Sequence, residues 1–499
     1  MDLNKHNELR EKVRKVYTDI PVQEVYFNSR GSMKFEYKNP QGEIRKTYLD
    51  PMTSSVIMNA LVPKSGVIFR GGHGGGKTTL VEKVSYMLTG IPEAEISSAM
   101  IRGNDDQNVN TLLATLKLGK LMTEGSEEVK WRNFVKCYVK IIDEVNRFPP
   151  PAQNSLFEIL NRGRIEFIDN VFEIDDFMAF ATENPNDPGT YPLSKPFIDR
   201  FAFCVPAPQI PTASDQYLLA DRVDDKLKGV TVKPVMTLDE LKSAKKLISS
   251  DIKMSSEALI YTIYLTQALS TCERGDNFDK SHNEISVGER CKGCGFDTDV
   301  ALCKTTSYGV SGRAFLDFQR WAKAYAWFLE AFPPLDDKNP KKGYRPEVQL
   351  ETIQTIAPYL MYHRVEPNPM VLGKTPYFGM KMKLLEDVVI KATQAYNTIK
   401  DALKEVPSIL KGDLDFNSSA IRSVDKDLVV KYHFTPLVQE AGKPEFRQIY
   451  EDIATKKMEQ PFYNEIQRKI ALSTELGPHA QKYLLSKAIE KSKKELQQI

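Results

Sequence analysis

Five glycines lie within six residues directly after a short apolar run, and this feature limits the fold of the chain more than any other. The segment from Arg70 to Leu80 has the sequence RGGHGGGKTTL, and the apolar run Gly66–Phe69 precedes it. Glycine loses more backbone entropy on folding than other residues and packs nothing, so this place must need bare backbone. Four residues separate Gly71 from Gly76-Lys-Thr, which is the GxxxxGK[ST] spacing of a phosphate-binding loop.

The segments on either side of the loop fit a nucleotide-binding role. Residues 78–88 place apolar side chains at helical spacing, so strand, loop and helix follow in the order that the motif needs. Backbone N–H groups of such a loop surround phosphate oxygens at the positive N-terminus of the helix. The alternative is an ordinary glycine-rich turn with a helix-capping threonine. The predicted nucleotide contacts are Gly71, Gly72, His73, Gly74, Gly75, Gly76, Lys77, Thr78 and Thr79.

Composition places the chain among ordinary globular proteins and argues against several classes of function. The 499 residues are enough for two or three domains, and 41% are hydrophobic while 27% are charged. The formal charge of +2 gives no general attraction to nucleic acid. There is no apolar run of about 18 residues, and the charged start predicts a helix rather than a signal peptide. We therefore expect a cytoplasmic protein whose six cysteines are thiols or metal ligands.

A second buried strand ends in two carboxylates. Residues 134–146 have the sequence FVKCYVKIIDEVN, an apolar, β-branched run that stops at Asp143 and Glu144. Ligands of open α/β sheets lie at the carboxyl ends of the strands, so these acids are expected to face the nucleotide. Asp143 would hold Mg²⁺ together with Thr78, and Glu144 would polarise the water that attacks the γ-phosphate. The alternative is that the pair caps the helix predicted after it.

Three further segments carry polar residues of the kind that a nucleotide site needs. A predicted strand at residues 176–185 ends at Asn184, the sequence FIDRF contains Arg200, and a predicted helix start, GVSGRA, contains Arg313. Each has an ordinary explanation when it is taken alone. Asn184 is a turn residue before proline, Arg200 a surface arginine, and Arg313 a common residue at the beginning of a helix.

Taken in order, the five segments resemble the MoxR family of AAA+ ATPases over roughly residues 50–365. The sequence IIDEVNRFPPPAQNSLFEILNRG resembles the family's Walker B stretch, ATENP its sensor 1, and GTYPLSKPFIDRF its arginine-finger segment. GVSGRA resembles its sensor 2, and residues 348–367, with LMYHRVEP, resemble the end of its lid domain. The long stretches around the Walker B and arginine-finger sites are not general features of phosphate-binding loops.

The resemblance implies roles for individual residues. Lys77 and Thr78 would bind phosphate and Mg²⁺, and Asn184 would position the attacking water. Arg200 would act in trans on the nucleotide of a neighbouring subunit, and Arg313 would reach the nucleotide in cis from the lid. Two departures from the family pattern put nucleotide affinity in doubt more than chemistry. His73 stands where the family usually has proline, and Gly312 replaces the proline before the sensor 2 arginine.

The resemblance also implies an assembly and a kind of partner. Members of the family form rings, commonly hexamers, and remodel or activate partner proteins, often ones with a von Willebrand factor A domain. Residues 112–134 occupy the place of an insert that faces the pore of the ring, although an ordinary surface hairpin is an equal alternative.

An inserted segment between two predicted lid helices has the cysteine spacing of a metal site. Cys272, Cys291, Cys294 and Cys303 give C-x18-C-x2-C-x8-C. Four thiolates close a tetrahedron around zinc, and the segment has too few apolar residues to fold without such a support. A structural zinc ion is therefore expected, with His282 as an alternative to Cys272. A redox pair at Cys291 and Cys294 and unligated thiols are the other options. Cys137 and Cys204 are expected in the core.

The expected fold class is α/β. It comprises an AAA+ α/β/α P-loop NTPase core, a helical lid domain carrying the small zinc-binding insertion, and a mostly helical C-terminal region. The expected domains are an N-terminal helix and β-hairpin extension (1–45), the nucleotide-binding core (46–208), the lid (209–365, with the zinc-binding insertion at 270–306) and the C-terminal region (366–499).

Three functions compete at this stage. The first is an ATP-hydrolysing, ring-forming chaperone or remodelling factor for a partner protein. The second is a nucleic-acid-associated AAA+ motor, or restriction-type NTPase, that binds DNA with the zinc module. The balanced charge and the lack of a cluster of basic and aromatic residues argue against it. The third is a nucleotide-dependent scaffold with slow turnover, which ranks last because Glu144 is present.

Overall fold

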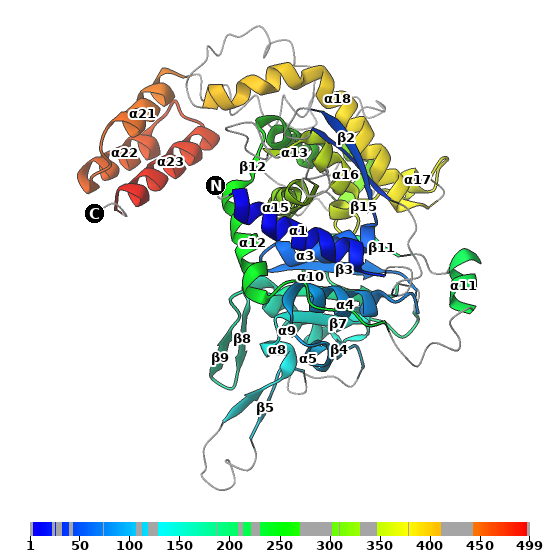
Figure 1. Ribbon diagram of the computed structural model, residues 1–499. Helices are drawn as coiled ribbons and strands as arrows, with labels where there is room; N and C mark the ends of the chain where they lie inside the picture. The colour runs from blue at the N-terminus through cyan, green and yellow to red at the C-terminus, as the bar shows by residue number, and fades with distance from the viewer. Residues whose placement is uncertain are drawn as a thin grey trace. The chain divides into compact units, whose positions relative to one another are not determined.

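The computed structural model describes most of the chain in two compact units (Figure 1). The first unit consists of Met1–Ala258, Val310–Glu366 and Leu372–Glu386, and the second of Leu259–Gly309, Pro367–Val371 and Asp387–Ile499. The described residues are 3–21, 25, 32–38, 43–72, 74–105, 112–117, 128–185, 187–207, 213–220, 230–269, 302–308, 310–329, 347–377, 379–410 and 443–496.

A parallel sheet of five strands forms the centre of the first unit, in the order β11-β3-β10-β7-β4. The order places β10 between β3 and β7, so that Phe180 lies beside Val67 on one side and Ile141 on the other. Because all the strands run the same way, their carboxyl ends meet at one edge. The strands are β3 (Ser65–Arg70), β4 (Ile101–Arg102), β7 (Val139–Asp143), β10 (Met178–Glu183) and β11 (Phe203–Pro206).

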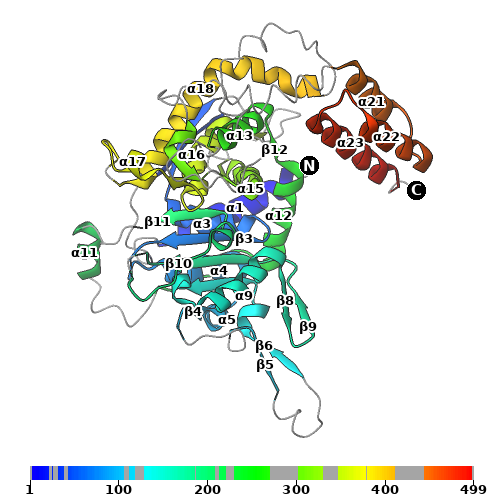
Figure 2. The same ribbon diagram turned by 180° about the vertical axis from the view of Figure 1, so that it is seen from behind.

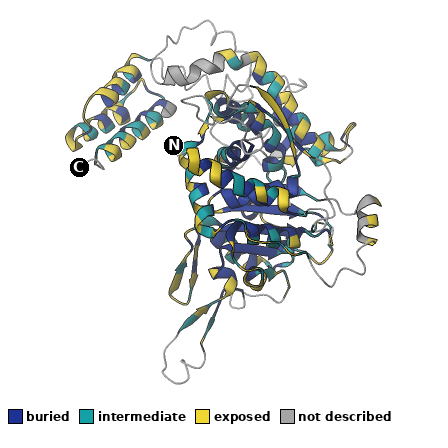
Figure 3. Cartoon of the chain, viewed as in Figure 1, coloured by how far each residue is buried: buried dark blue, intermediate teal, exposed yellow. Residues whose placement is uncertain are grey.

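Helices cover both faces of this sheet, which explains why its strands are nearly continuous apolar runs (Figure 2). Helices α3 (Pro51–Leu61) and α4 (Lys77–Thr89) pack on one face, and α9 (Pro150–Arg162) packs on the other. Alternate strand residues therefore enter different cores, and both cores exclude water (Figure 3). Two shorter helices, α5 (Glu93–Ala99) and α8 (Asn133–Lys136), lie against β7.

Two antiparallel hairpins extend from the core. The first pairs β5 (Ala114–Leu116) with β6 (Val129–Trp131), and the second pairs β8 (Arg164–Phe167) with β9 (Asn170–Glu173). The ring of Trp131 lies 5.5 Å from Phe172 and 6.5 Å from Phe167, so the two hairpins pack on each other. The first hairpin falls within residues 112–134, where the sequence predicts an insert, and its tip lies outside the described residues.

Several of the remaining helices of the first unit pack along the β11 edge of the sheet or over α3. Phe203 of β11 stacks against Trp321 at 4.5 Å and Tyr359 at 5.2 Å, which holds two of these helices against that edge. The hairpin of β1 (Met33–Lys38) and β2 (Ile44–Leu49) packs on α16. The other elements are α1 (Leu3–Asp19), η1 (Val145–Arg147), α10 (Lys195–Ile198), α11 (Ala213–Ala220), α12 (Leu238–Asp251), β12 (Lys253–Met254), α15 (Gly312–Leu329), β14 (Glu347–Val348) and α16 (Leu350–Met361).

The second unit is mostly helical where it is described. Helices α21 (Pro444–Thr455), α22 (Gln460–Leu472) and α23 (Pro478–Leu496) form a bundle whose core includes Phe446 and Leu484, both fully buried. No helix in the described part of the chain is both long and apolar enough to span a bilayer. Further elements along the chain are α13 (Ser256–Ala268), η3 (Leu302–Thr305), β13 (Thr306–Tyr308), β15 (Glu366–Pro367), α17 (Pro369–Leu372) and α18 (Lys381–Leu410).

Candidate nucleotide-binding site

The glycine-rich loop connects β3 to α4 at the carboxyl edge of the sheet. Gly76 caps the helix in the left-handed region, at φ +80°, which side-chain-bearing residues seldom adopt. A Cβ atom on Gly71 would lie 2.2 Å from the carbonyl oxygen of Ala207, so no other residue fits there. The Gly71 N–H donates to the carbonyl of Glu183 at 2.9 Å, which ties the loop to β10. The predicted need for bare backbone is thus explained by close packing as well as by phosphate access.

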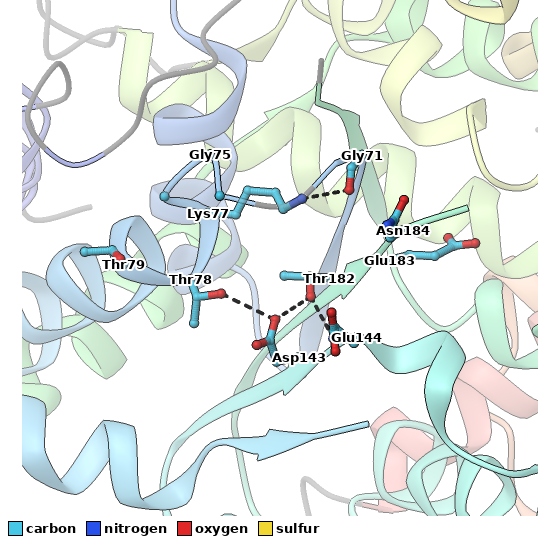
Figure 4. A pocket seen from close by; sticks show the side chains of 12 residues that line it. Gly71, Gly75, Lys77, Thr78, Thr79, Asp143, Glu144, Thr182, Glu183 and Asn184 are labelled. Carbon is cyan, nitrogen blue, oxygen red and sulfur yellow. Dashed lines mark hydrogen bonds between the residues drawn. The ribbon is translucent and has the colours of Figure 1, made fainter. Parts of the chain in front are cut away.

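Lys77 is the first residue of α4, and its ammonium group is held inside the loop. Its Nζ donates to the carbonyl oxygen of Gly71 at 2.9 Å (Figure 4). It also donates to the carbonyl oxygen of Gly72 at 2.6 Å. Burial lowers the pKa of Lys77, and the charges of Asp143 and Glu144 oppose that shift. A phosphate group at this position would give the buried ammonium an ionic partner in place of two neutral carbonyls.

Asp143 ends β7 and lies beside the first turn of α4. Its Oδ1 accepts hydrogen bonds from the hydroxyl of Thr182 at 2.6 Å and from that of Thr78 at 3.4 Å. The predicted pair Thr78 and Asp143 is therefore brought together from positions 65 residues apart in the chain. A carboxylate and a hydroxyl are hard oxygen donors, which Mg²⁺ prefers, so the residues present fit that ion.

Glu144 follows in an unusual backbone conformation. Its φ is +52°, and its N–H donates to the hydroxyl of Thr182 at 2.8 Å. This conformation is uncommon for a residue with a side chain and is typical of functional turns. The carboxylate lies 3.2 Å from the guanidinium of Arg147, one turn further along the chain. Both acids nevertheless line the same cavity.

Most of the predicted residues line one cavity of ≈210 Å³, although Gly72 of the loop does not. Sequence reasoning missed two of its residues, Thr182 and Glu183, which lie on β10 just before Asn184. Glu183 is buried and accepts two hydrogen bonds from Arg70, each at 2.9 Å. Two polar residues in a row within a buried strand were the signal that could have identified them. The lining residues are Gly71, Gly74, Gly75, Gly76, Lys77, Thr78, Thr79, Asp143, Glu144, Thr182, Glu183 and Asn184.

The two predicted arginines are not among the described residues that line this cavity. The guanidinium of Arg200 lies 4.8 Å from the ring centre of Phe157, and its Nε is buried without a hydrogen-bond partner. Arg313 donates to Asn161 at 3.4 Å. Because Phe157 and Asn161 are one turn apart on α9, the two arginines lie near each other over the same helix.

Arg313 is therefore not at the cavity of its own chain, where a contact with the nucleotide in cis would need it. Arg313 lines a different cavity, of ≈540 Å³, together with Leu61 at the end of α3. The reason is the packing of α15, since the Nε1 of Trp321 donates to the hydroxyl of Ser65 at 3.1 Å. Ser65 begins β3, whereas the phosphate-binding loop follows the other end of that strand.

The predicted zinc site lies outside the part of the chain that can be described. This holds for Cys272, His282, Cys291 and Cys294 and for the side chain of Cys303, as it does for His73 in the loop. Within the described ranges, no cluster of three or more His, Cys, Asp and Glu side chains could hold a metal ion. The zinc prediction thus remains a prediction.

The other two cysteines are in the core, as expected. Cys137 and Cys204 are buried free thiols. Burial raises the pKa of Cys204 to about 12, so this thiol stays protonated and acts as a small apolar side chain.

Comparison with known proteins supports the interpretation of this site. Residues 66–201 match the family described as the AAA domain, dynein-related subfamily. Chaperone MoxR1 of Mycobacterium tuberculosis is 26% identical over 150 residues, which are 30% of this chain and 37% of that protein. The uncharacterised protein YeaC of Bacillus subtilis is 36% identical over 67 residues, 13% of this chain and 21% of the other. The matched stretches thus cover 37% or less of the length of each of these two relatives.

A solved structure is similar in fold over a larger part of the chain. It is the crystal structure of a candidate ATPase from Cytophaga hutchinsonii, with a TM-score of 0.55 and 19% identity. The similarity covers 78% of this chain and 96% of the other. The sheet, the loop and the two carboxylates define a P-loop nucleotide-binding protein. Together with the family match, they identify residues 66–201 as an AAA domain, and part of this chain is similar to Chaperone MoxR1.

Proposed function

We propose that this protein hydrolyses ATP and uses the reaction to remodel a partner protein. The observation that carries the proposal is the convergence of Lys77, Thr78, Asp143 and Glu144 on one cavity at the carboxyl edge of the sheet. Four residues from two separate motifs meet there with the chemistry that phosphoryl transfer to water needs: a cation, a magnesium site and a base.

Each residue has a distinct part in this proposal. Lys77 exchanges its two carbonyl partners for the β- and γ-phosphate oxygens of ATP. Thr78 and Asp143 hold Mg²⁺, which when bound neutralises charge on the phosphates. Glu144 accepts a proton from the attacking water, and Asn184 orients that water. The glycine N–H groups bind the remaining phosphate oxygens.

Arg200 and Arg313 act on the nucleotide of a neighbouring subunit. Neither lines the cavity of its own chain, and the buried Nε of Arg200 has no partner. Positive charge supplied across a subunit interface would stabilise the charge that develops on the γ-phosphate. For Arg313, this replaces the expectation of a contact in cis. A ring, commonly a hexamer, is the assembly that gives every subunit such a neighbour.

The nature of the partner is the least constrained part of the proposal. The name of Chaperone MoxR1 supports a remodelling role. The proposed partner carries a von Willebrand factor A domain, and the proposed location is the cytoplasm. The proposed domains span residues 1–45, 46–208, 209–365 and 366–499. The zinc module stabilises the insertion within the lid and takes no part in hydrolysis.

Glu144→Gln is the decisive test of hydrolysis. We expect turnover to fall by roughly 100- to 10,000-fold, because the change removes the base, while Asp143 and Thr78 still hold Mg²⁺. The affinity for ATP, measured with a fluorescent analogue, should stay within about threefold of wild type. Lys77→Ala should instead lose ATP binding itself.

The matched control is Glu166→Gln, the same change on β8 and outside the cavity, which should leave turnover unchanged. Hydrolysis by Glu144→Gln at the wild-type rate would contradict the assignment of the base. ATP binding by Lys77→Ala at wild-type affinity would contradict the assignment of the phosphate site.

A further inference from the structure

The backbone around Arg200 is held by residues that follow α16. Arg364 donates from Nη2 to the carbonyl of Asp199 at 3.0 Å and from Nη1 to that of Ala202 at 3.2 Å. His363 contacts the carbonyl of Phe201 through Nε2 at 2.6 Å. Three carbonyl oxygens within four residues are thus bound by two neighbouring side chains. These hydrogen bonds fix the backbone on both sides of Arg200 and do not involve its side chain.

The guanidinium of Arg364 is held in place by several hydrogen bonds. Its Nε donates to the carboxylate of Asp199 at 2.9 Å, and its Nη2 also donates to that of Asp317 at 2.6 Å. The Arg364 and Asp317 side chains are only 2% and 5% exposed. A buried guanidinium with this many partners cannot leave them to bind phosphate without a large penalty. Its chemistry is that of a positioning residue.

His363 is neutral, so its hydrogen bond to the carbonyl of Phe201 does not depend on pH near neutrality. Burial, and then the charge of Arg364, lower the pKa of His363 well below its usual value, so the ring is neutral. A carbonyl only accepts, so Nε2 must carry the proton and donate it to Phe201.

The same cluster reaches the second arginine. The hydroxyl of Ser311 donates to both carboxylate oxygens of Asp199, at 2.9 and 3.0 Å. Ser311 Oγ also accepts from the N–H of Ala314 at 3.1 Å and so caps the helix that carries Arg313. Asp199 therefore connects the segment of Arg200 to the helix start of Arg313.

We propose that Arg364, acting through Asp199 and together with His363, positions Arg200 and Arg313 for their action on the neighbouring subunit's nucleotide. This rests on the proposed function, because it assumes that the two arginines act in trans. The physical basis is preorganisation. A guanidinium presented on a fixed backbone needs no rearrangement when charge develops on the phosphate, and a displacement of about 1 Å can lower a rate roughly 100-fold.

Arg364→Lys separates positioning from charge. Lysine keeps the positive charge but has one short ammonium group, which cannot reach both carboxylates and both carbonyls at once. We expect kcat for ATP to fall roughly 10- to 100-fold while the affinity for an ATP analogue changes less than about threefold. The matched control is Arg320→Lys. Arg320 is also paired with Asp317, at 3.5 Å, and should keep wild-type turnover.

Mixed assemblies distinguish positioning from general damage. Subunits with Arg364→Lys keep an intact Glu144, and subunits with Glu144→Gln keep an intact Arg364 and Arg200. If Arg364 acts on the neighbour's site, mixing the two impaired proteins raises turnover above the sum of the separate activities, as mixing Arg200→Ala with Glu144→Gln does. Asp199→Asn, at a side chain that is 21% exposed, is a second and milder variant for which we expect the same pattern.

Three results would overturn the proposal. The first is wild-type turnover in both Arg364→Lys and Asp199→Asn. The second is equal loss of ATP affinity and kcat in both variants. The third is lack of recovery on mixing with Glu144→Gln when Arg200→Ala does recover with the same partner. Failure of Arg200→Ala itself to recover would instead contradict the proposed action in trans.

Discussion

At the scale of single residues, one hydroxyl orients both Asp143 and Glu144. Thr182 donates to Asp143 and accepts from the backbone of Glu144, so it fixes the direction of both residues at the end of β7. Its own strand, β10, is paired with β7, which makes the position rigid. Groups that orient ligands in this way usually matter nearly as much as the ligands themselves.

We therefore predict that Thr182→Val lowers ATP turnover by roughly 10- to 100-fold, while the fold is kept because valine has nearly the same shape. The apparent Kd for Mg²⁺ should rise. Thr182→Ser retains the hydroxyl and should recover most of the activity. Steady-state ATPase assays at increasing Mg²⁺ concentrations would measure both effects, and a Thr182→Val protein with wild-type kinetics would show that the hydroxyl is dispensable.

A buried lysine, Lys140, stabilises the start of β7. Lys140 is fully buried on β7, and its Nζ donates to the carbonyls of Phe134 at 2.8 Å, Val135 at 3.1 Å and Cys137 at 2.9 Å. Burial lowers the pKa of Lys140 to about 8. Three donors meet three acceptors at the end of α8, where carbonyls would otherwise lack partners.

Lys140→Met should lower the free energy of unfolding by about 2–4 kcal/mol, because it leaves several buried carbonyls without donors. The same change at Lys130, an exposed residue on β6, is the control and should alter stability by less than about 0.5 kcal/mol. Urea denaturation followed by circular dichroism gives both values. Equal stability of the two variants would mean that water replaces the lost donor.

At the scale of elements, the cysteine spacing of the insertion at residues 270–306 predicts that the protein binds zinc. Purified without chelator, the protein should carry about one zinc ion per chain at Zn–S distances of ~2.3 Å. Cys294→Ser should lose this zinc and become sensitive to proteases between residues 270 and 306, because the sequence of the insertion has too few apolar residues to fold without the metal.

Metal analysis and limited proteolysis test this prediction together. ATP turnover should fall less than in Lys77→Ala, since the nucleotide contacts come from the α/β core. Full zinc content in Cys294→Ser, or its absence from the wild-type protein, would argue for one of the other cysteine states. Complete loss of turnover on metal removal would mean that the insertion positions Arg313.

At the scale of the whole molecule, the proposed action of the two arginines in trans would make hydrolysis depend on assembly. A subunit alone would have its base and magnesium ligands but lack the cation that neutralises the γ-phosphate. Turnover per subunit should therefore rise with protein concentration and level off once oligomers form, as measured by light scattering alongside ATPase assays.

A mixing experiment tests this dependence directly. Arg200→Ala alone should lose roughly 1,000-fold or more in turnover, as expected for an arginine that acts in trans. Mixed with Glu144→Gln, it should recover activity at interfaces that join an intact Glu144 to an intact Arg200. Co-assembly without recovery, shown with two differently tagged proteins, would count against a trans role.

Local sequence predicted most of the residues that line the candidate nucleotide cavity. The loop glycines, Lys77, Asp143 and Glu144 each follow a buried strand, and parallel strands bring their carboxyl ends to one edge by geometry alone. A residue placed just after such a strand must therefore face the site. This is why motifs far apart in the chain could be assigned to one cavity before its shape was known.

Only the tertiary structure decided where the arginines lie and what holds them. The direction of a packed helix depends on contacts between distant residues, such as the one between Trp321 and Ser65, 256 positions apart. That contact draws α15 toward the beginning of β3 and moves Arg313 away from the loop. No pattern along the chain encodes such a contact, because its free energy arises only when both surfaces are buried together. For the same reason, Thr182 and Arg364 acquire their roles from neighbours that the sequence does not place beside them.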